Sequence, residues 1–342
     1  HMLAQSAITN WLPERGTNGV YEAQQTVPND ACSRFTAESY TLTSILLETP
    51  LVEEEVVVED AAAKKREEEE RLKRKKLAKA QKKKNKISHG YVFEVDPKKD
   101  FLQKPVPLKK MGRFNHEAVA FDKFGCAYLT EDRSDGLLYK FIPKNKTSID
   151  DGSLYALKIS EKDSRNWKKR DILLNQKFSV DWIRLEDIDP ESDTLRIEGI
   201  EKGATIFARG EGLAQDNKSI FITCTSGGHL RKGQIWKLTP QSKNESTLEL
   251  WFEVGKNDML NMPDNLTVAP WGDLIVCEDN PDIDRLWGIK PNGEVYLIAE
   301  NNYSRAELAG VCFNPLNNVL YLNIQQNGQT LAIDGDWNKV RS

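Results

Sequence analysis

Four segments of this chain repeat one plan, and that repeat constrains the fold more than any other feature. Each segment opens with an acidic residue, continues as an apolar strand, turns, and continues as a second strand. The segments are EAVAFDKFGCAYLTED from residue 117, EGLAQDNKSIFITCTS from 211, DNLTVAPWGDLIVCED from 264 and ELAGVCFNPLNNVLYLNI from 307. Repeats at roughly 40–50 residue intervals are typical of β-propeller blades. We therefore predict an all-β chain folded as a β-propeller.

The opening acid and the end of the second strand keep a constant separation in three of these segments. The pairs that lie 14 residues apart are Glu117 and Glu131, Asp264 and Glu278, and Glu211 and Thr225. The fourth segment fits this spacing only if Glu307 is shifted by about two positions. The spacing therefore predicts that four acids occupy near-equivalent places in their blades.

Equivalent positions of propeller blades face one central axis, so these acids would bring several carboxylates together. Crowded carboxylates repel one another and their pKa values rise unless a cation joins them. Calcium takes about 6–8 oxygen ligands, which a ring of Glu and Asp can supply. The predicted calcium ligands are Glu117, Glu211, Asp264 and Glu307, with Glu131, Asp132, Glu278 and Asp279 as further candidates.

Arg209 is the candidate for binding an anion beside this metal site. It lies two residues before Glu211 in the sequence ARGEG, so both side chains point to one face of a strand. A guanidinium next to metal-bound carboxylates is well placed to hold a phosphate group. The alternative is a structural ion pair with Glu211. We interpret the nearby His89 and His116 as structural residues, because the charge of the motif lies on Glu117.

Residues 61–87 form a charged insertion rather than part of a blade. This segment is rich in Lys and Glu, has no Gly or Pro, and has too few large apolar residues to bury a face. We predict a solvated helix or a disordered insertion; the alternative is a basic arm for phosphate-rich polymers or membranes. Residues 64–86 carry a net charge of +9, so the overall −4 leaves about −13 elsewhere. An acidic body suits cations better than nucleic acid.

The remaining sequence divides into an N-terminal segment, 1–60, which we expect to contribute to the first blades, and a propeller domain, 88–342. Five widely spaced cysteines form no disulfide framework, and no apolar run approaches a membrane span. The opening His1-Met2 looks like the remnant of a tag, so a missing signal peptide is uninformative.

Several blocks of the propeller region resemble the PhoX family of alkaline phosphatases. The resemblance covers about residues 88–335 and follows the order of the family's motifs. The blocks are HGYVFEV (89–95), GRFNHEAVAFD (112–122), YLTEDRSDGLLYKFIP (128–143), ARGEG (208–212), FITCTSGG (221–228), GQIWKL (233–238), MPDNLTVAPWGDLIVCED (262–279) and ELAG (307–310).

The resemblance implies a six-bladed propeller that hydrolyses phosphomonoesters at alkaline pH with calcium and iron, joined by an oxo bridge. It matches the family's metal-binding acids to Glu117, Glu211, Asp264 and Glu307 and its phosphate-contacting arginine to Arg209. Since phosphatases of this family are exported, it also implies a secreted or periplasmic setting.

The iron-binding block of the family is the part that this sequence matches least. The family has NCAGG…TPWGTW…CEE, in which a Cys binds iron and a Glu also ligates metal. The nearest stretch here is NDACSRFTAESYTLTSILLETP (29–50), which lacks the Gly-Gly and Trp signature. Cys32 and Glu48 stand at about the family's separation, so they are the candidate iron ligands.

Three functions therefore stay open from the sequence. The first is a metal-dependent phosphomonoesterase, a monomer that acts on a small phosphate ester and binds no specific nucleic acid. The second is a calcium-dependent propeller lactonase or other esterase, which also uses an inner ring of acids. The third is a non-catalytic calcium-binding propeller, which the altered iron-binding block favours.

Overall fold

The computed structural model describes residues 37–41, 89–96, 98–99, 102, 104–145, 148–159 and 163–342, the first range by its backbone alone. Chain contacts divide the protein into one unit of His1–Leu47 with Tyr91–Ser342 and a second unit of Glu48–Gly90. Of the second unit the structure describes only His89 and Gly90, so the predicted helical or disordered insertion at 61–87 lies outside the described residues.

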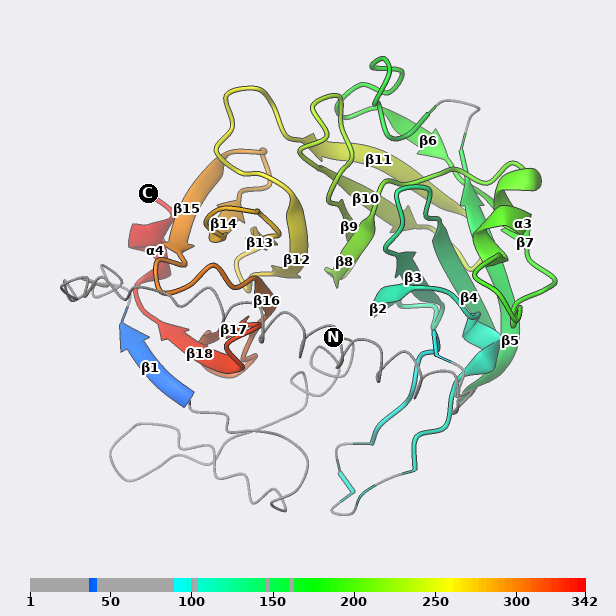
Figure 1. Cartoon of the computed structure of the whole chain (residues 1–342), viewed down its shortest axis with the longest axis horizontal. Coiled ribbons are helices and arrows are strands. Elements are labelled where there is room, and N and C mark those ends of the chain that lie inside the picture. The colour runs from blue at the N-terminus through cyan, green and yellow to red at the C-terminus, as the bar shows by residue number, and fades with distance from the viewer. Residues whose placement is uncertain are drawn as a thin grey trace, which may run out of the picture. The chain divides into compact units, whose positions relative to one another are not determined.

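The first unit is built almost entirely from β-strands that form four sheets, as a propeller requires (Figure 1). One sheet contains β2 (His116–Phe121), β3 (Ala127–Glu131), β4 (Leu138–Asn145), β5 (Ser148–Lys158) and β7 (Asp181–Arg184). The next contains β8 (Gly210–Gln215), β9 (Ile220–Cys224), β10 (Gln234–Pro240), β11 (Ser246–Glu253) and β6 (Lys177–Ser179). The third contains β12 (Pro263–Val268), β13 (Leu274–Glu278), β14 (Arg285–Ile289) and β15 (Val295–Glu300).

The fourth sheet joins distant parts of the chain. It contains β16 (Leu308–Phe313), β17 (Leu320–Ile324) and β18 (Gln329–Asp334), and β1 (Ala37–Thr41) pairs with β18 in parallel. The all-β propeller prediction is therefore confirmed, and residues 37–41 contribute a strand to it. The six blades that the resemblance implies remain a prediction, since the described residues form four sheets.

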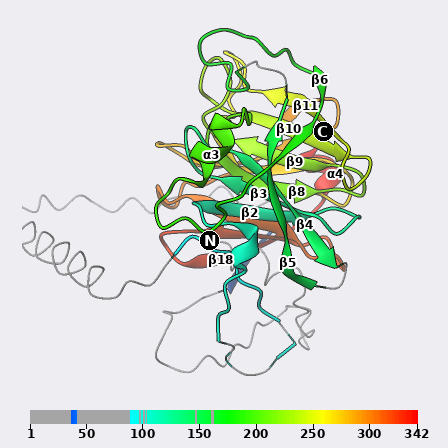
Figure 2. The same cartoon turned by 90° about the vertical axis from the view of Figure 1, so that its right-hand side faces the viewer.

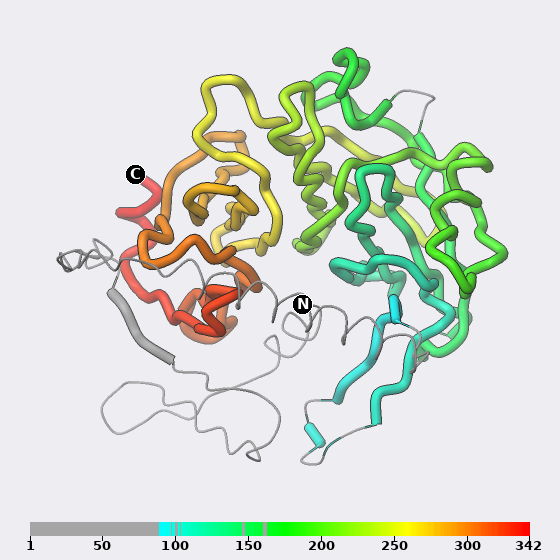
Figure 3. The backbone as a smooth tube through the Cα atoms, in the orientation of Figure 1, coloured from blue at the N-terminus to red at the C-terminus, as the bar shows by residue number. Residues whose placement is uncertain are grey.

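The four sheets follow one another in chain order around a common centre (Figures 1 and 3). The first strand of each sheet is the innermost, and the packed pairs of inner strands are β2 with β8, β8 with β12, and β12 with β16. Turned by 90°, the same unit shows helix α3 and strand β5 on the side that faces the viewer (Figure 2). Because each inner strand packs against the next, the repeated acids at the starts of these strands lie close together.

Alternation along each strand fills the spaces between neighbouring sheets with apolar side chains. On β3, Tyr128 faces the core shared with β8–β11, whereas Leu129 faces a core on the opposite side of the sheet. Further apolar clusters lie between the second and third sheets and between the third and fourth. Cys126, Cys224 and Cys277 are buried within these layers as small apolar residues.

The stretch 163–200 is not a separate blade, although its sequence departs from the repeat. It adds β6 to the outer edge of the second sheet and then returns to add β7 to the outer edge of the first. Helix α3 (Leu195–Glu201) follows; a 3₁₀ turn (Lys109–Met111) and helix α4 (Trp337–Val340) complete the described helices. Among these helices none is long and apolar enough to cross a membrane.

Candidate metal centre

A β-bulge at the start of each inner strand positions the acidic residues. On β2 the register shifts between His116 and Val119, and the corresponding shifts occur between Gly210 and Leu213, Pro263 and Leu266, and Ala309 and Cys312. In each bulge one strand has an extra residue opposite its partner, which re-aims the side chains there. The bulged positions that correspond to one another hold Glu117, Glu211, Asp264 and Gly310.

Two glycines allow this arrangement. Gly212 follows Glu211, and a Cβ there would lie 2.6 Å from the carbonyl oxygen of Asp264, so only glycine lets β8 approach β12 so closely. Gly310 has φ of +64°, and a Cβ there would clash with Nδ2 of Asn323. The fourth sheet thus has glycine where the others have an acid, and its acid, Glu307, lies three residues earlier. The shift is one residue larger than the sequence predicts.

Arg209 lies among carboxylates from three sheets. Its Nη2 is 2.6 Å from Oε1 of Glu211, its Nε is 2.9 Å from Oδ1 of Asp132, and its Nη1 is 3.0 Å from Oδ2 of Asp279. Its backbone has φ of +53°, which a residue with a Cβ rarely adopts. The ion pair with Glu211 was one of the two predicted roles, and the structure adds Asp132 and Asp279.

The acids around Arg209 form one interacting group, which we call the inner carboxylate cluster. Its members are Glu117, Asp132, Glu211, Asp264, Asp279 and Glu307. Burial, followed by the charge of Asp264 and then of Asp132, raises the pKa of Glu117 to about 7. The same causes raise the pKa of Glu211 strongly, although Arg209 opposes the shift. Among the described residues these six carboxyl groups share the guanidinium of Arg209, so burial and mutual repulsion oppose their full ionisation.

Glu307 joins the cluster despite its displaced position. Burial and the charges of Asp264 and Asp279 raise its pKa to about 8, and a side-chain hydrogen bond links it to Asp264. A hydrogen bond between two carboxyl groups requires a proton on one of them, and burial raises the pKa of both Asp264 and Glu307. The structure thus brings together all four acids that the sequence predicts as calcium ligands.

Glu131 and Glu278, by contrast, are used within their own sheets. Both are fully buried at the ends of second strands. Oε2 of Glu131 accepts hydrogen bonds from the Leu137 backbone N–H and from the Tyr139 hydroxyl. The backbone N–H groups of Asn261 and Arg285 donate to the two carboxylate oxygens of Glu278. We therefore leave Glu131 and Glu278 out of the candidate ligand set.

The strand register also corrects one equivalence drawn from the sequence. Gly210 pairs with Cys224, whereas His116 pairs with Glu131 and Pro263 with Glu278. Cys224, not Thr225, therefore occupies the place of the two buried glutamates in the second sheet. The connection between β8 and β9 is one residue shorter than those between β2 and β3 and between β12 and β13, which a fixed spacing of 14 residues conceals.

Two threonines that the sequence interpretation missed hold the inner strands in place. Thr130 and Thr223 occupy equivalent positions next to the ends of β3 and β9. The Thr130 hydroxyl donates to the carbonyl oxygen of Glu211 at 2.5 Å, and that of Thr223 donates to the carbonyl oxygen of Asp264 at 2.5 Å. Each threonine thus fixes the backbone of an acid in the next sheet. Their recurrence in two repeats was the available signal.

His116 has the structural role that its sequence context suggested. It stacks on Phe114 with ring centroids 3.5 Å apart, and its Nε2 lies 3.1 Å from the Gly112 carbonyl oxygen. Burial lowers its pKa to about 4, so the imidazole is neutral at physiological pH. It supports the strand that carries Glu117 without adding charge to the cluster.

The donor chemistry of the cluster fits calcium. All its donors are carboxylate oxygens, which hard cations prefer. Within the described ranges no three His, Cys, Asp or Glu side chains already stand as a metal-binding group. Arg209 contacts one oxygen each of Asp132, Glu211 and Asp279, which leaves the oxygens of Glu117, Asp264 and Glu307 for a cation. Cys32 and Glu48, the candidate iron ligands, lie outside the described residues.

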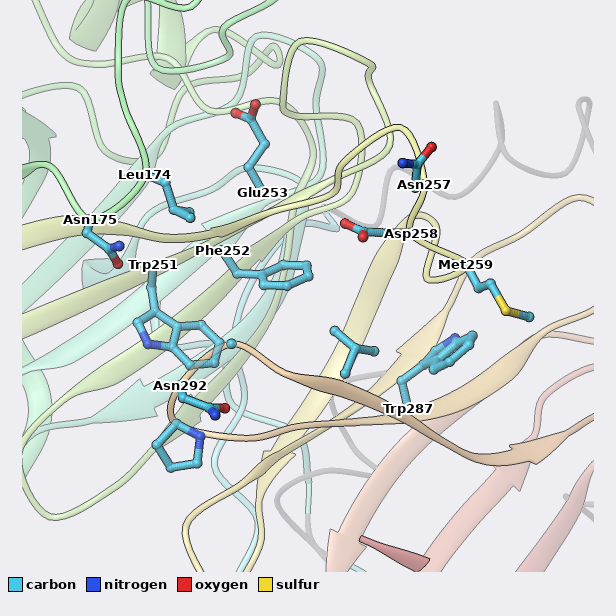
Figure 4. Close-up of a pocket in the computed structure, with 13 residues that line it drawn as sticks. Leu174, Asn175, Trp251, Phe252, Glu253, Asn257, Asp258, Met259, Trp287 and Asn292 are labelled. Carbon is cyan, nitrogen blue, oxygen red and sulfur yellow. The ribbon is translucent and has the colours of Figure 1, made fainter. Parts of the chain in front are cut away.

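A cavity of about 540 Å³ lies away from the cluster, between the second and third sheets. Figure 4 shows Trp251 and Phe252 of β11 on one side and Trp287 of β14 on the other. None of the acids predicted as ligands, and not Arg209, lines it. We therefore place the candidate site at the cluster.

Comparison with known proteins supports the family suggested by the motifs. The family model for alkaline phosphatase PhoX matches residues 48–328. A search of curated proteins returned no match. Among solved structures, a gluconolactonase from Xanthomonas campestris is 11% identical with a TM-score of 0.35, over 62% of this chain and 55% of that one.

A second solved structure, virginiamycin B lyase from Staphylococcus aureus, is 11% identical with a TM-score of 0.30, over 63% of this chain and 64% of that one. The chain thus spans less than two thirds of either structure, and likenesses this distant carry no argument about function. The family match is different, because it covers most of the sequence and includes every member of the inner carboxylate cluster. The chain therefore belongs to the alkaline phosphatase PhoX family.

Proposed function

We propose that this chain is a metal-dependent phosphomonoesterase in which the inner carboxylate cluster holds calcium and Arg209 binds the phosphate group. The observation that carries the proposal is the position of Arg209, a single guanidinium with a left-handed backbone among carboxylates from three sheets. Strained residues of this kind often occur at functional sites. The three carboxylates that Arg209 contacts belong to three different sheets, so its guanidinium lies where the inner strands converge.

The proposed calcium ligands are the acids whose oxygens Arg209 leaves available. Glu117, Asp264 and Glu307 make no ion pair with Arg209, and the second oxygen of Glu211 is also outside its contacts. Burial raises the pKa values of these four acids, so their carboxylates are costly to ionise together without a cation. Calcium would offset that cost.

Arg209 would orient the ester. When bound, the metal supplies positive charge that polarises the phosphate and stabilises the transition state. The guanidinium presents a planar fork of N–H donors that matches two non-bridging phosphate oxygens. Asp132 and Asp279 keep this fork in place, because they contact its Nε and Nη1. The backbone N–H of Arg209 donates to the Arg133 carbonyl oxygen at 2.8 Å, which anchors the left-handed turn.

Hydrolysis of p-nitrophenyl phosphate across pH 7–10, with calcium alone and with calcium and iron, tests the proposal. We expect metal-dependent turnover that Arg209→Lys reduces, because lysine keeps the charge but not the fork. A lactone assayed in parallel addresses the esterase alternative. Bound metal without turnover of either substrate would contradict the proposal and favour a non-catalytic calcium-binding propeller. A small ester substrate, a monomeric chain without specific nucleic-acid binding, and a secreted or periplasmic setting belong to the same proposal.

A further inference from the structure

Backbone strain is concentrated at and next to the inner carboxylate cluster, and two of the strained residues have no part in the proposed function. Among the residues that the structure describes, three that are neither Gly nor Asn have left-handed backbones, namely Arg209 at φ of +53°, Arg231 at +55° and Met262 at +51°. Asparagine tolerates this region of φ, but arginine and methionine rarely adopt it. Strain held at several linked positions suggests that their placement matters.

Hydrogen bonds link these three residues into one network. The backbone N–H of Met262 donates to the Lys232 carbonyl oxygen at 2.6 Å, and the N–H of Asp279 donates to the Met262 carbonyl oxygen at 3.0 Å. At its other end the loop 225–233 begins at Thr225, whose N–H donates to the Arg209 carbonyl oxygen at 3.0 Å. The loop that carries Arg231 is thus attached to the candidate site at both ends.

Arg231 stacks on an aromatic ring instead of pairing with an acid. Its guanidinium carbon lies 4.5 Å from the centroid of Trp167, and that of Arg165 lies 4.7 Å from the same centroid. The indole Nε1 of Trp167 donates to the Ser226 carbonyl oxygen at 2.7 Å, which ties the ring to the loop. The stack holds the Arg231 side chain in one plane and leaves the guanidinium edges available.

The neighbouring arginines are neutralised, whereas Arg231 is not. Arg165 pairs with Asp163 at 2.8 Å, and Arg170 lies 3.5 Å from Glu253. Over the part of the chain that the structure describes, Arg231 forms neither an ion pair nor a side-chain hydrogen bond, and it is exposed. A guanidinium has five N–H donors, so Arg231 can bind an anion through two of its oxygens without breaking an existing contact.

We infer that Arg231, held on Trp167, is a specificity residue that binds a second phosphate group of the ester whose first phosphate lies at Arg209. The inference rests on the proposed function, and it names the substrate class as small molecules with two phosphate groups. A guanidinium favours phosphate because its fork matches two phosphate oxygens. Stacking of a nucleobase on Trp167 is less favourable, because two guanidinium groups already lie over its ring.

A series of alkanediol bisphosphates, each compared with the monophosphate of the same chain length, tests the inference. We expect one spacer length at which the wild-type kcat/KM of the bisphosphate exceeds that of its monophosphate by at least tenfold. Arg231→Ala should reduce this ratio about tenfold through KM, and Arg231→Lys should restore only part of it. Lys168→Ala is the matched control, because it removes an exposed positive charge from the neighbouring segment and should keep the ratio.

A ratio near one at every spacer length, or equal losses in Arg231→Ala and Lys168→Ala, would overturn the inference. Binding separates this failure from failure of the proposed function. Isothermal titration calorimetry with the non-hydrolysable alkane bisphosphonate of each length needs no turnover. If no ester is hydrolysed but the bisphosphonate binds at least tenfold more tightly to wild type than to Arg231→Ala, the anion site stands and the phosphatase proposal falls. Equal affinities of wild type and Arg231→Ala for the bisphosphonate would show that Arg231 does not bind the second phosphate group.

Discussion

Two strands end in a glutamate followed by an aspartate, and the two carboxylates of each pair have different roles. The pairs are Glu131 with Asp132 and Glu278 with Asp279. The glutamates are fully buried, and their carboxylates accept hydrogen bonds within their own sheets. The aspartates, one residue further, point to the other side and contact Arg209. Alternation along a strand therefore separates carboxylates that hold the fold from carboxylates that form the site.

The largest expected effect follows from removing the guanidinium that the aspartates share. Arg209→Met keeps similar bulk but leaves the inner carboxylate cluster without its positive partner. We expect kcat/KM for p-nitrophenyl phosphate to fall by about 10²–10³-fold, the usual loss for a donor that stabilises transition-state charge. Unfolding in urea with a calcium chelator should also show a loss of about 3 kcal/mol, because buried carboxylates lose their partner. Unchanged activity would contradict the role of Arg209.

The second largest effect is on calcium affinity, which should distinguish the acids of the inner carboxylate cluster from the buried glutamates at the strand ends. Asp264→Asn removes a proposed ligand and should weaken calcium binding by at least tenfold, as measured by isothermal titration calorimetry. Glu278→Gln is the matched control: it should leave the affinity within about twofold but destabilise the fold by about 1–3 kcal/mol, because one backbone N–H loses its acceptor. Equal changes in affinity would show that the separation between site and fold is wrong.

The pH dependence of stability sharpens the contrast for Glu131. Burial raises its pKa from 4.5 to about 7, so the folded chain keeps a proton that the unfolded chain has released between these values. Its contribution is therefore complete below pH 4.5 and is lost as pH rises through 7. In calcium-saturated protein, the free energy of unfolding of wild type should therefore fall between pH 4.5 and 7. That of Glu131→Gln should fall less, and the difference between the two decreases should be at most about 3 kcal/mol. If the free energies of unfolding in urea of the two proteins changed equally with pH, this prediction would be wrong.

The smallest effect concerns the threonines that join neighbouring sheets. Thr223→Val keeps the shape of the side chain but removes its hydrogen bond to the Asp264 carbonyl oxygen. We expect a loss of about 1 kcal/mol in chemical unfolding, together with weaker calcium binding because Asp264 is less well fixed. Thr247→Val is the control, since Thr247 lies on outer strand β11 and its hydroxyl bonds to Gln241 at an exposed position. Similar effects of both changes would show that Thr223 has no special role.

The sequence repeat predicts the propeller and the four acids because each repeat places one acid at the start of an inner strand. It does not reveal which way neighbouring acids point. From the sequence, Glu278 and Asp279 are equally good ligand candidates, and only the strand register shows that their side chains lie on opposite sides of the sheet. It also overlooks Gly310, because the repeat alone does not show that the bulged position of the fourth sheet holds glycine and that Glu307 lies three residues earlier. The outer strands β6 and β7 were unpredictable for a different reason, since each pairs with a sheet edge set by tertiary contacts.

The central claim is that the inner carboxylate cluster, and not the buried strand-end glutamates, holds calcium. Metal analysis by mass spectrometry on wild type, Asp264→Asn and Glu278→Gln, each dialysed against the same low calcium concentration, tests it most directly. We predict bound calcium in wild type and in Glu278→Gln and a large loss in Asp264→Asn. Calcium retained by Asp264→Asn but lost from Glu278→Gln would contradict the account.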